Sequence, residues 1–153
     1  MDVLHSIDVR FKRVREDNEV ILPSYATAGS AGVDLHACLE RDLEILPGQV
    51  VKVPTGWAME LPGSQAVGLV FARSGLAAKF GLALANGVGV IDSDYRGEIQ
   101  VLVVNQGQES VIIHSGERIA QMLFIPVWHA HLSEAASLND TGRGTGGFGS
   151  TGV

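Results

Sequence analysis

Cysteine is nearly absent from this sequence, and so are the signals of secretion and membrane insertion. The one cysteine, Cys38, has no second thiol to pair with, which excludes an intramolecular disulfide. The first residues, MDVLHSIDVRFKRVRE, lack an apolar stretch followed by a small-residue cleavage site. No apolar run approaches the roughly 18 residues that a membrane-spanning helix needs. We therefore expect a cytoplasmic or otherwise intracellular protein with no secretory signal and no membrane association.

Positive charge is scarce as well. Lysine and arginine number 11 against 17 aspartates and glutamates, which gives a formal net charge of −6. Proteins that bind nucleic-acid polymers usually carry a basic face or stripe, so such a partner is not expected. The five histidines form no H-E-x-x-H motif and no pair with cysteine, which argues against zinc and thiol catalysis. His129 and His131 alternate along an expected strand and are interpreted as part of a solvated face.

What the sequence does contain is a series of short apolar segments separated by turn residues. Its 153 residues, 46% of them hydrophobic, suffice for one domain with a buried core. Only Ser74–Phe80 has a helical pattern, and Gly81 follows it at the C-cap position. The pattern predicts an all-β barrel or sandwich with one short helix. Strands are expected at residues 7–11, 33–38, 43–46, 50–53, 65–71, 98–104, 111–113 and 119–127.

Glycine is abundant, with 19 residues, and six of them lie in the last twelve positions, GRGTGGFGSTGV. A segment so rich in glycine cannot hold a helix or strand by itself. Residues 144–149 match G-x-G-x-x-G, but no strand precedes them and no helix follows, so a dinucleotide-binding motif is rejected. We interpret residues 1–138 as a compact β domain and residues 139–153 as a mobile arm, with a disordered tail as the alternative.

Residues 86–97, NGVGVIDSDYRG, concentrate the most chemistry. Asp92 directly follows an apolar run, and Tyr95 comes three residues later. A carboxylate that emerges from an apolar strand can act as a general base toward water, and an aromatic ring can stack on a flat or sugar-like ligand. These two residues are therefore candidates for catalysis and ligand binding.

Three other segments could contact an anion such as phosphate. Arg73 and Ser74 stand at the start of the expected helix, where unpaired N–H groups favour a phosphate. Gln121 interrupts an apolar strand, and a phosphate oxygen could satisfy its amide. Residues 27–35, TAGSAGVDL, place Asp34 after a glycine-serine turn. Two of these segments also have a plainer interpretation, with Ser74 as an ordinary N-cap and Asp34 as a turn-capping residue.

Taken in order, these four segments and the glycine-rich tail resemble the deoxyuridine triphosphate nucleotidohydrolases (dUTPases) of the homotrimeric type. The resemblance runs from about Leu22 to Thr151. It implies a distorted jelly-roll β-barrel and a homotrimer whose active sites are shared between subunits. It also implies Mg²⁺-dependent hydrolysis of dUTP to dUMP and pyrophosphate, which limits uracil in DNA and supplies dUMP for thymidylate synthesis.

The resemblance further implies roles for individual residues. Asp92 would orient and deprotonate the water that attacks the α-phosphorus, and Tyr95 would lie beneath the deoxyribose. In the closed arm, Arg143 would reach the γ-phosphate and Phe148 would stack on the uracil. Asp34 would lie near the magnesium through water, because the triphosphate oxygens are its direct ligands in this family. The substrate-binding positions are Arg73, Ser74, Gly75, Asn86, Val90, Ile91, Tyr95, Gln100, Gln121, Arg143 and Phe148, with Arg73, Ser74 and Gly75 serving a second subunit's site.

Two departures from the family pattern and two alternative functions accompany this resemblance. Ala72 stands where a proline often precedes Arg-Ser-Gly, and Phe80 stands where a histidine is common. A dCTP deaminase of the same superfamily would place a glutamate in the strand at residues 99–104, which has no carboxylate. A non-enzymatic jelly-roll binding protein would leave the candidate site residues without a purpose.

Overall fold

The computed structural model describes residues 6–16 and 19–149, and nearly all its regular structure is β-strand. The one helix of these residues, α1 (Ser74–Phe80), lies in the expected place. The strands are β1 (Arg10–Arg13), β2 (Ser24–Tyr25), β3 (Val33–His36), β4 (Leu43–Ile45), β5 (Val50–Pro54), β6 (Trp57–Glu60), β7 (Ala66–Ala72), β8 (Leu82–Leu84), β9 (Gly89–Ile91), β10 (Gln100–Asn105), β11 (Val111–Ile113) and β12 (Arg118–Pro126).

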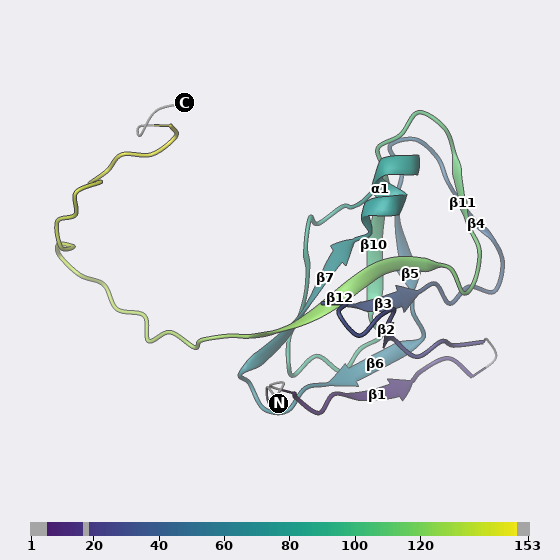
Figure 1. Ribbon diagram of the computed structural model, residues 1–153, viewed down its shortest axis with the longest axis horizontal. Helices are drawn as coiled ribbons and strands as arrows, with labels where there is room; N and C mark the ends of the chain where they lie inside the picture. The colour runs from purple at the N-terminus through teal and green to yellow at the C-terminus, as the bar shows by residue number, and fades with distance from the viewer. Residues whose placement is uncertain (1–5, 17–18, 150–153) are drawn as a thin grey trace.

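All strand pairs among the described residues are antiparallel, and most of them join segments that are distant in sequence. The largest sheet has the order β2-β3-β12-β7-β9, and a second has the order β5-β10-β8. Two ribbons, β1-β6 and β4-β11, complete the body, and the long strand β12 crosses its middle (Figure 1). The predicted all-β, jelly-roll-like fold with one short helix is confirmed, although the strands form separate sheets and not one closed barrel.

The core lies between the sheets, where alternate residues of each strand point inward. In β10 the buried positions are Val101, Val103 and Asn105, as the period-two pattern predicts. Asn105 is a buried polar residue, yet its amide is satisfied. Its Nδ2 donates to the carbonyl of Ile45 at 2.9 Å and to that of Glu109 at 2.8 Å. The Asn105 side chain thus ties β10 to the adjacent connections instead of destabilising the core.

Helix α1 begins and ends at the expected residues, but its N-cap residue differs from the expected one. Gly81 adopts a left-handed φ of 69°, and its N–H bonds the carbonyl of Ala77 at 2.9 Å. An added Cβ at Gly81 would lie 2.7 Å from the backbone nitrogen of Gly107, so a larger residue is also excluded by space. The interpretation of Ser74 as the N-cap is wrong, because Arg73 occupies that position with extended backbone angles and Ser74 is the first helical residue.

Beyond β12 the described chain runs away from the body as an extended, exposed segment (Figure 1). The expected strand through His129 and His131 is wrong, since β12 ends at Pro126 and no strand follows among the described residues up to 149. The extended segment begins before the change in composition at Asn139, and the division between residues 1–138 and 139–153 stays a prediction. Residues 150–153 of the expected arm lie outside the described residues.

Membrane insertion by a helix finds no support in this architecture. Within residues 6–16 and 19–149, the model has no helix both apolar enough and long enough to cross a bilayer.

Candidate active site

The loop after β9 presents Asp92 and Tyr95 at the edge of the largest sheet. Asp92 directly follows this edge strand, and the Tyr95 N–H donates to the Asp92 carbonyl at 3.1 Å, which closes a tight turn. The Tyr95 hydroxyl donates to the Glu98 carbonyl at 3.0 Å. The ring lies so close to Gly97 that an added Cβ there would be 2.5 Å from Tyr95 Cζ. Glycine at position 97 therefore permits the observed orientation of the ring.

A pocket of about 250 Å³ opens beside these residues, and we call it the Asp92 pocket. Five predicted site residues line it together, namely Val90, Ile91, Asp92, Tyr95 and Gln100. The pocket is completed by Lys52, Glu98 and Leu102, which the sequence did not single out. Tyr95 is 44% exposed and Val90 is 59% exposed, so both offer apolar surface to a ligand. The Asp92 pocket combines a carboxylate with aromatic and aliphatic surface, a composition typical of small-molecule binding sites.

Glu98 is the most constrained charged side chain of the Asp92 pocket. Its carboxylate accepts two hydrogen bonds from Arg15, at 2.6 Å from Nε and 3.0 Å from Nη2. It also accepts one from the Gly56 N–H at 2.9 Å and one from Gln100 Nε2 at 3.3 Å. Burial raises the pKa of the Glu98 carboxyl, but the hydrogen bonds outweigh burial and hold that pKa below its ordinary value. Glu98 is thus a charged carboxylate that is fully engaged by the protein.

A second polar group lies where β3 meets β12 and the start of α1, and we call it the arginine cluster. Its centre is Asp34, whose side chain is only 13% exposed. Asp34 Oδ1 lies 3.3 Å from Arg73 Nε, and Oδ2 lies 3.2 Å from Arg118 Nη1. Gln121 faces Asp34 in the β3–β12 register and donates from Nε2 to the Ala72 carbonyl at 3.1 Å. The fold therefore brings three predicted residues together, Asp34, Arg73 and Gln121, and adds Arg118.

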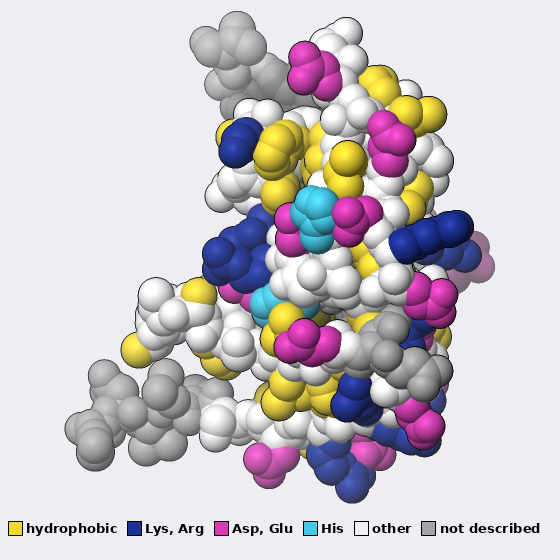
Figure 2. Space-filling model, turned by 90° about the vertical axis from the view of Figure 1, so that its right-hand side faces the viewer, with side chains coloured by type: hydrophobic (Ala, Val, Ile, Leu, Met, Phe, Trp, Pro, Cys, Tyr) yellow, Lys and Arg dark blue, Asp and Glu magenta, His cyan; other side chains and the backbone are white. Residues whose placement is uncertain are grey.

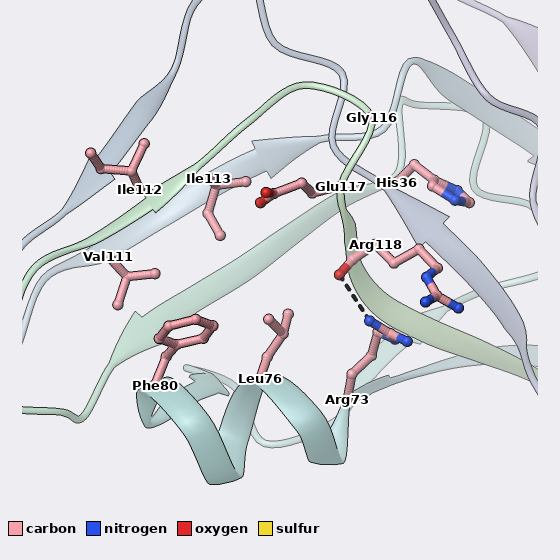
Figure 3. A pocket seen from close by; sticks show the side chains of 10 residues that line it. All are labelled: His36, Arg73, Leu76, Phe80, Val111, Ile112, Ile113, Gly116, Glu117 and Arg118. Atoms are coloured by element: carbon pink, nitrogen blue, oxygen red, sulfur yellow. Dashed lines mark hydrogen bonds between the residues drawn. The ribbon is translucent and has the colours of Figure 1, made fainter.

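A larger cavity of about 440 Å³ adjoins the arginine cluster. Figure 3 shows Leu76 and Phe80 projecting from α1 toward Val111 and Ile113, with Arg73 reaching the Arg118 carbonyl at 3.3 Å. His36 also lines this cavity, and its Nδ1 is buried with no hydrogen-bond partner among the described residues. Burial lowers the pKa of His36 below its ordinary value. The cavity thus combines an apolar wall from α1 and β11 with a cationic rim.

The surface around β4 and β11 carries charges of both signs. Figure 2 shows acidic and basic side chains interspersed with hydrophobic ones on this face, with no continuous basic stripe.

The Asp92 pocket and the cavity at the arginine cluster share no lining residue. Accordingly, Arg73 does not line the Asp92 pocket of its own chain, and neither do Ser74, Gly75 and Gln121. Asn86 occupies the turn between β8 and β9 outside the Asp92 pocket lining, where its carbonyl accepts the Val88 N–H at 2.8 Å. One chain therefore assembles two separate groups of predicted site residues.

The two predicted residues of the arm contact neither group in the structure. Arg143 Nε donates to the Gly146 carbonyl at 2.9 Å, a bond within the arm itself. Phe148 is fully exposed and has a positive φ of 51°, an unusual value for a residue with a side chain. Their roles toward a ligand remain predictions.

Metal-ligating side chains are dispersed. Among residues 6–16 and 19–149, no three histidine, cysteine, aspartate or glutamate side chains are close enough to hold an ion together.

The sequence predicts no site role for Lys52, Glu98 and Arg118. A charged residue in a strand is ordinarily interpreted as part of its solvated face, as with Lys52 in β5. Glu98 lies just after the Asp92 segment, but its partner Arg15 is 83 positions away. Arg118, like Gln121, is a polar residue set into an apolar strand, but its partner Asp34 is 84 positions away.

Comparison with known proteins places these features in one family. The dUTPase family model matches residues 18–152. A deoxyuridine 5'-triphosphate nucleotidohydrolase of Desulfitobacterium hafniense (strain DSM 10664 / DCB-2) is 60% identical over 150 residues, covering 98% of this chain and 99% of that protein. The protein of the same name from Klebsiella pneumoniae subsp. pneumoniae is 46% identical over the same coverage.

Solved structures show the same fold. A variant of the dUTPase from Staphylococcus bacteriophage 80alpha, solved with dUpNHpp, superposes with a TM-score of 0.85 at 24% identity, over 95% of this chain and 99% of that chain. A variant of the phage phi11 dUTPase, described as coordinating a structural Mg(II) ion, superposes with a TM-score of 0.77 at 19% identity, over 87% and 99% of the two chains.

Proposed function

The chain belongs to the dUTPase family and hydrolyses dUTP to dUMP and pyrophosphate, and we propose that the Asp92 pocket is the nucleoside half of its active site. The observation that carries this proposal is the pairing in one pocket of Asp92, at the end of an apolar strand, with the fixed ring of Tyr95. Asp92 accepts a proton from a water molecule, whose oxygen then attacks the α-phosphorus. The bond from that phosphorus to the bridging oxygen breaks, and pyrophosphate leaves.

Tyr95 selects the sugar in this scheme. Its ring lies against Gly97, and its hydroxyl is bonded to the Glu98 carbonyl. These two contacts set the orientation of the ring, and in that orientation it excludes a 2′-hydroxyl by contact. Val90 and Ile91 supply apolar surface, and backbone groups between Asn86 and Asp92 bind the uracil edge.

The phosphates bind to residues of a second chain. Arg73, Ser74, Gly75 and Gln121 do not line the Asp92 pocket of their own chain, which supports a site assembled between subunits. A homotrimer with three shared sites satisfies this requirement. Guanidinium groups bind phosphate through charge-assisted, often bidentate hydrogen bonds, so Arg73 supplies the strongest contact of the four.

Magnesium is the cofactor in this proposal, and the donor set of the chain fits it. The described residues offer single carboxylates and no group of three, so the triphosphate oxygens would be the direct ligands and Asp34 would contact the ion through water. The ion would supply neutralisation of charge on the phosphates. Asp34, held by Arg73 and Arg118, would fix the orientation of that outer contact.

The C-terminal arm closes over the bound nucleotide. Arg143 contacts the γ-phosphate and Phe148 stacks on the uracil of a neighbouring subunit's site. The extended course of residues 127–149, away from the body of their own chain, supports this reach to a neighbour. The substrate is a nucleotide of the cell interior, which supports the expected intracellular location.

The test is an assay of the intact chain and of Asp92→Asn with dUTP and with dCTP. We expect pyrophosphate from dUTP, no ammonia from dCTP, and a kcat for Asp92→Asn lower by about 10² to 10⁴ with nucleotide binding retained. Ammonia release would favour the deaminase alternative, and inactivity toward both nucleotides would favour a binding protein. A near wild-type kcat for Asp92→Asn would refute the base assignment.

A further inference from the structure

Arg15 lies outside the family-model match at residues 18–152, yet it forms hydrogen bonds with Glu98, which lines the Asp92 pocket. We propose that the Arg15–Glu98 ion pair is a positioning device for the Asp92 pocket. It fixes the Gln100 amide and keeps the Glu98 carboxylate out of the space that the nucleoside occupies. This inference rests on the proposed function, because it assigns Arg15 and Glu98 to the reaction carried out beside Asp92.

The backbone that carries Arg15 is itself held in place. It follows strand β1, which pairs with β6 with Arg13 opposite Trp57. The Val14 N–H donates to the Gly56 carbonyl at 2.9 Å, and Arg13 Nε donates to the Arg15 carbonyl at 2.9 Å. The guanidinium therefore projects from a backbone that is anchored on the same corner, at residue 56, as the carboxylate it binds.

The Arg15–Glu98 pair has a defined geometry. Arg15 uses two nitrogens, Nε and Nη2, on the two oxygens of Glu98, at 2.6 and 3.0 Å. The Glu98 side chain is 15% exposed and that of Arg15 is 33% exposed, so water screens the pair only in part. A two-pronged contact of this kind defines a direction as well as a distance, which a lysine ammonium cannot do.

Glu98 is in turn bonded to residues that line the Asp92 pocket. An ionised carboxylate only accepts hydrogen bonds, so Gln100 must turn its Nε2 toward Glu98, as observed at 3.3 Å. The Gln100 carbonyl oxygen is thereby left for other partners. The main chain of Glu98 also receives the Tyr95 hydroxyl. Glu98 thus contacts two residues of the proposed nucleoside pocket.

Without Arg15, the Glu98 carboxylate would lose its charged partner. Its carboxylate would be largely buried with only the Gly56 N–H and Gln100 as partners, which is unfavourable for a charge. Among the described residues that line the Asp92 pocket, the one cation is Lys52. A carboxylate that turns toward Lys52 enters the pocket, adds negative charge beside Asp92 and releases the Gln100 amide.

The competing explanation is that the pair only stabilises the fold by tying β1 to the body. The two explanations differ in what they change. A purely structural pair alters the melting temperature and leaves the kinetics of the folded enzyme intact. A positioning pair alters KM and the preference for dUTP over UTP in protein that remains folded.

The experiment compares Arg15→Ala, Arg15→Lys, Glu98→Gln and the double variant Arg15→Ala/Glu98→Gln in the full-length chain, with Lys12→Ala as the control. Lys12→Ala removes a cation from the adjacent strand β1, at an exposed position that does not line the Asp92 pocket. Each variant is assayed for kcat and KM with dUTP and UTP, and its melting temperature is recorded.

We expect Arg15→Ala to lower kcat/KM for dUTP about tenfold or more, mainly through KM, and to narrow the preference over UTP. Arg15→Lys should retain more activity than Arg15→Ala, because lysine keeps the positive charge but lacks the two-nitrogen contact with the carboxylate. The double variant should lose less than Arg15→Ala alone, because it leaves no uncompensated carboxylate. Lys12→Ala should match the wild type.

A kcat/KM within twofold of wild type in folded Arg15→Ala, or a loss no greater than that of Lys12→Ala, would overturn the positioning role. If Arg15→Ala does not fold, Arg15→Lys and Glu98→Gln decide, and unchanged KM and UTP preference in both would likewise overturn it. Failure of the proposed function is distinguishable, because then the wild-type chain would not hydrolyse dUTP or Asp92→Asn would remain active.

Discussion

Gly97→Ala tests how closely Tyr95 must be placed. The backbone at position 97 poses no obstacle to alanine, because its φ lies outside the left-handed region. Space is the obstacle, since the new Cβ would lie 2.5 Å from Tyr95 Cζ and 2.9 Å from Cε2. Carbon atoms pack at about 3.5 to 4.0 Å, so the ring must retreat by about 1 Å.

The magnitude follows from that displacement. Tyr95 is 44% exposed and can turn outward, so the fold should lose only about 1 kcal/mol, chiefly the hydrogen bond to the Glu98 carbonyl. A misplacement of about 1 Å in a positioning group can lower activity by about 10²-fold. We therefore expect a large loss of kcat/KM for dUTP and a weaker preference over UTP, with a small loss of stability.

The assay is pyrophosphate release from dUTP and UTP over a range of concentrations, combined with urea unfolding. Gly29→Ala is the matched control, because a Cβ at that position meets nothing within 4 Å. If Gly97→Ala hydrolyses dUTP as Gly29→Ala does and still rejects UTP, Tyr95 does not select the sugar by contact and the reasoning is refuted.

Three further predictions concern the core, the arm and acid stability. Asn105→Ala should destabilise the fold by about 3 kcal/mol in urea unfolding, because the Ile45 and Glu109 carbonyls lose their donor; a loss under 1 kcal/mol would contradict this. Deletion of residues 142–153 should leave a folded protein that binds dUTP but hydrolyses it slowly, and Arg143→Ala should reproduce much of that loss of rate. If the deletion leaves the single-turnover rate unchanged, the arm is a disordered tail. The pKa of Glu98 is held below its ordinary value of 4.5, so the ionised carboxylate stabilises the fold fully above that pH. This contribution to the free energy of unfolding is lost as pH falls through the folded-state pKa. Glu98→Gln should therefore lose less unfolding free energy in acid than the wild type, and parallel plots of unfolding free energy against pH would refute the lowered pKa.

Local patterns determined much of this protein. Alternation of apolar and polar residues placed most strands, and the helix Ser74–Phe80 with its Gly81 cap was predicted to the residue. These features depend on neighbours a few positions apart, which the sequence displays directly. The same holds for Asp92 and Tyr95, which lie within one turn. The expected strand through His129 and His131 failed because alternation alone cannot supply a partner strand for the backbone hydrogen bonds.

Contacts between distant segments were decided only by the tertiary structure. The sequence alone could not show that Arg15 grips Glu98 across 83 positions, or that Arg73 and Arg118 share Asp34. Nor could it show that Arg73 and Asp92 line separate pockets of one chain. The physical reason is that ion pairs and pockets depend on which sheet edges meet, and strand pairing at long range sets that, not the residues adjacent in sequence.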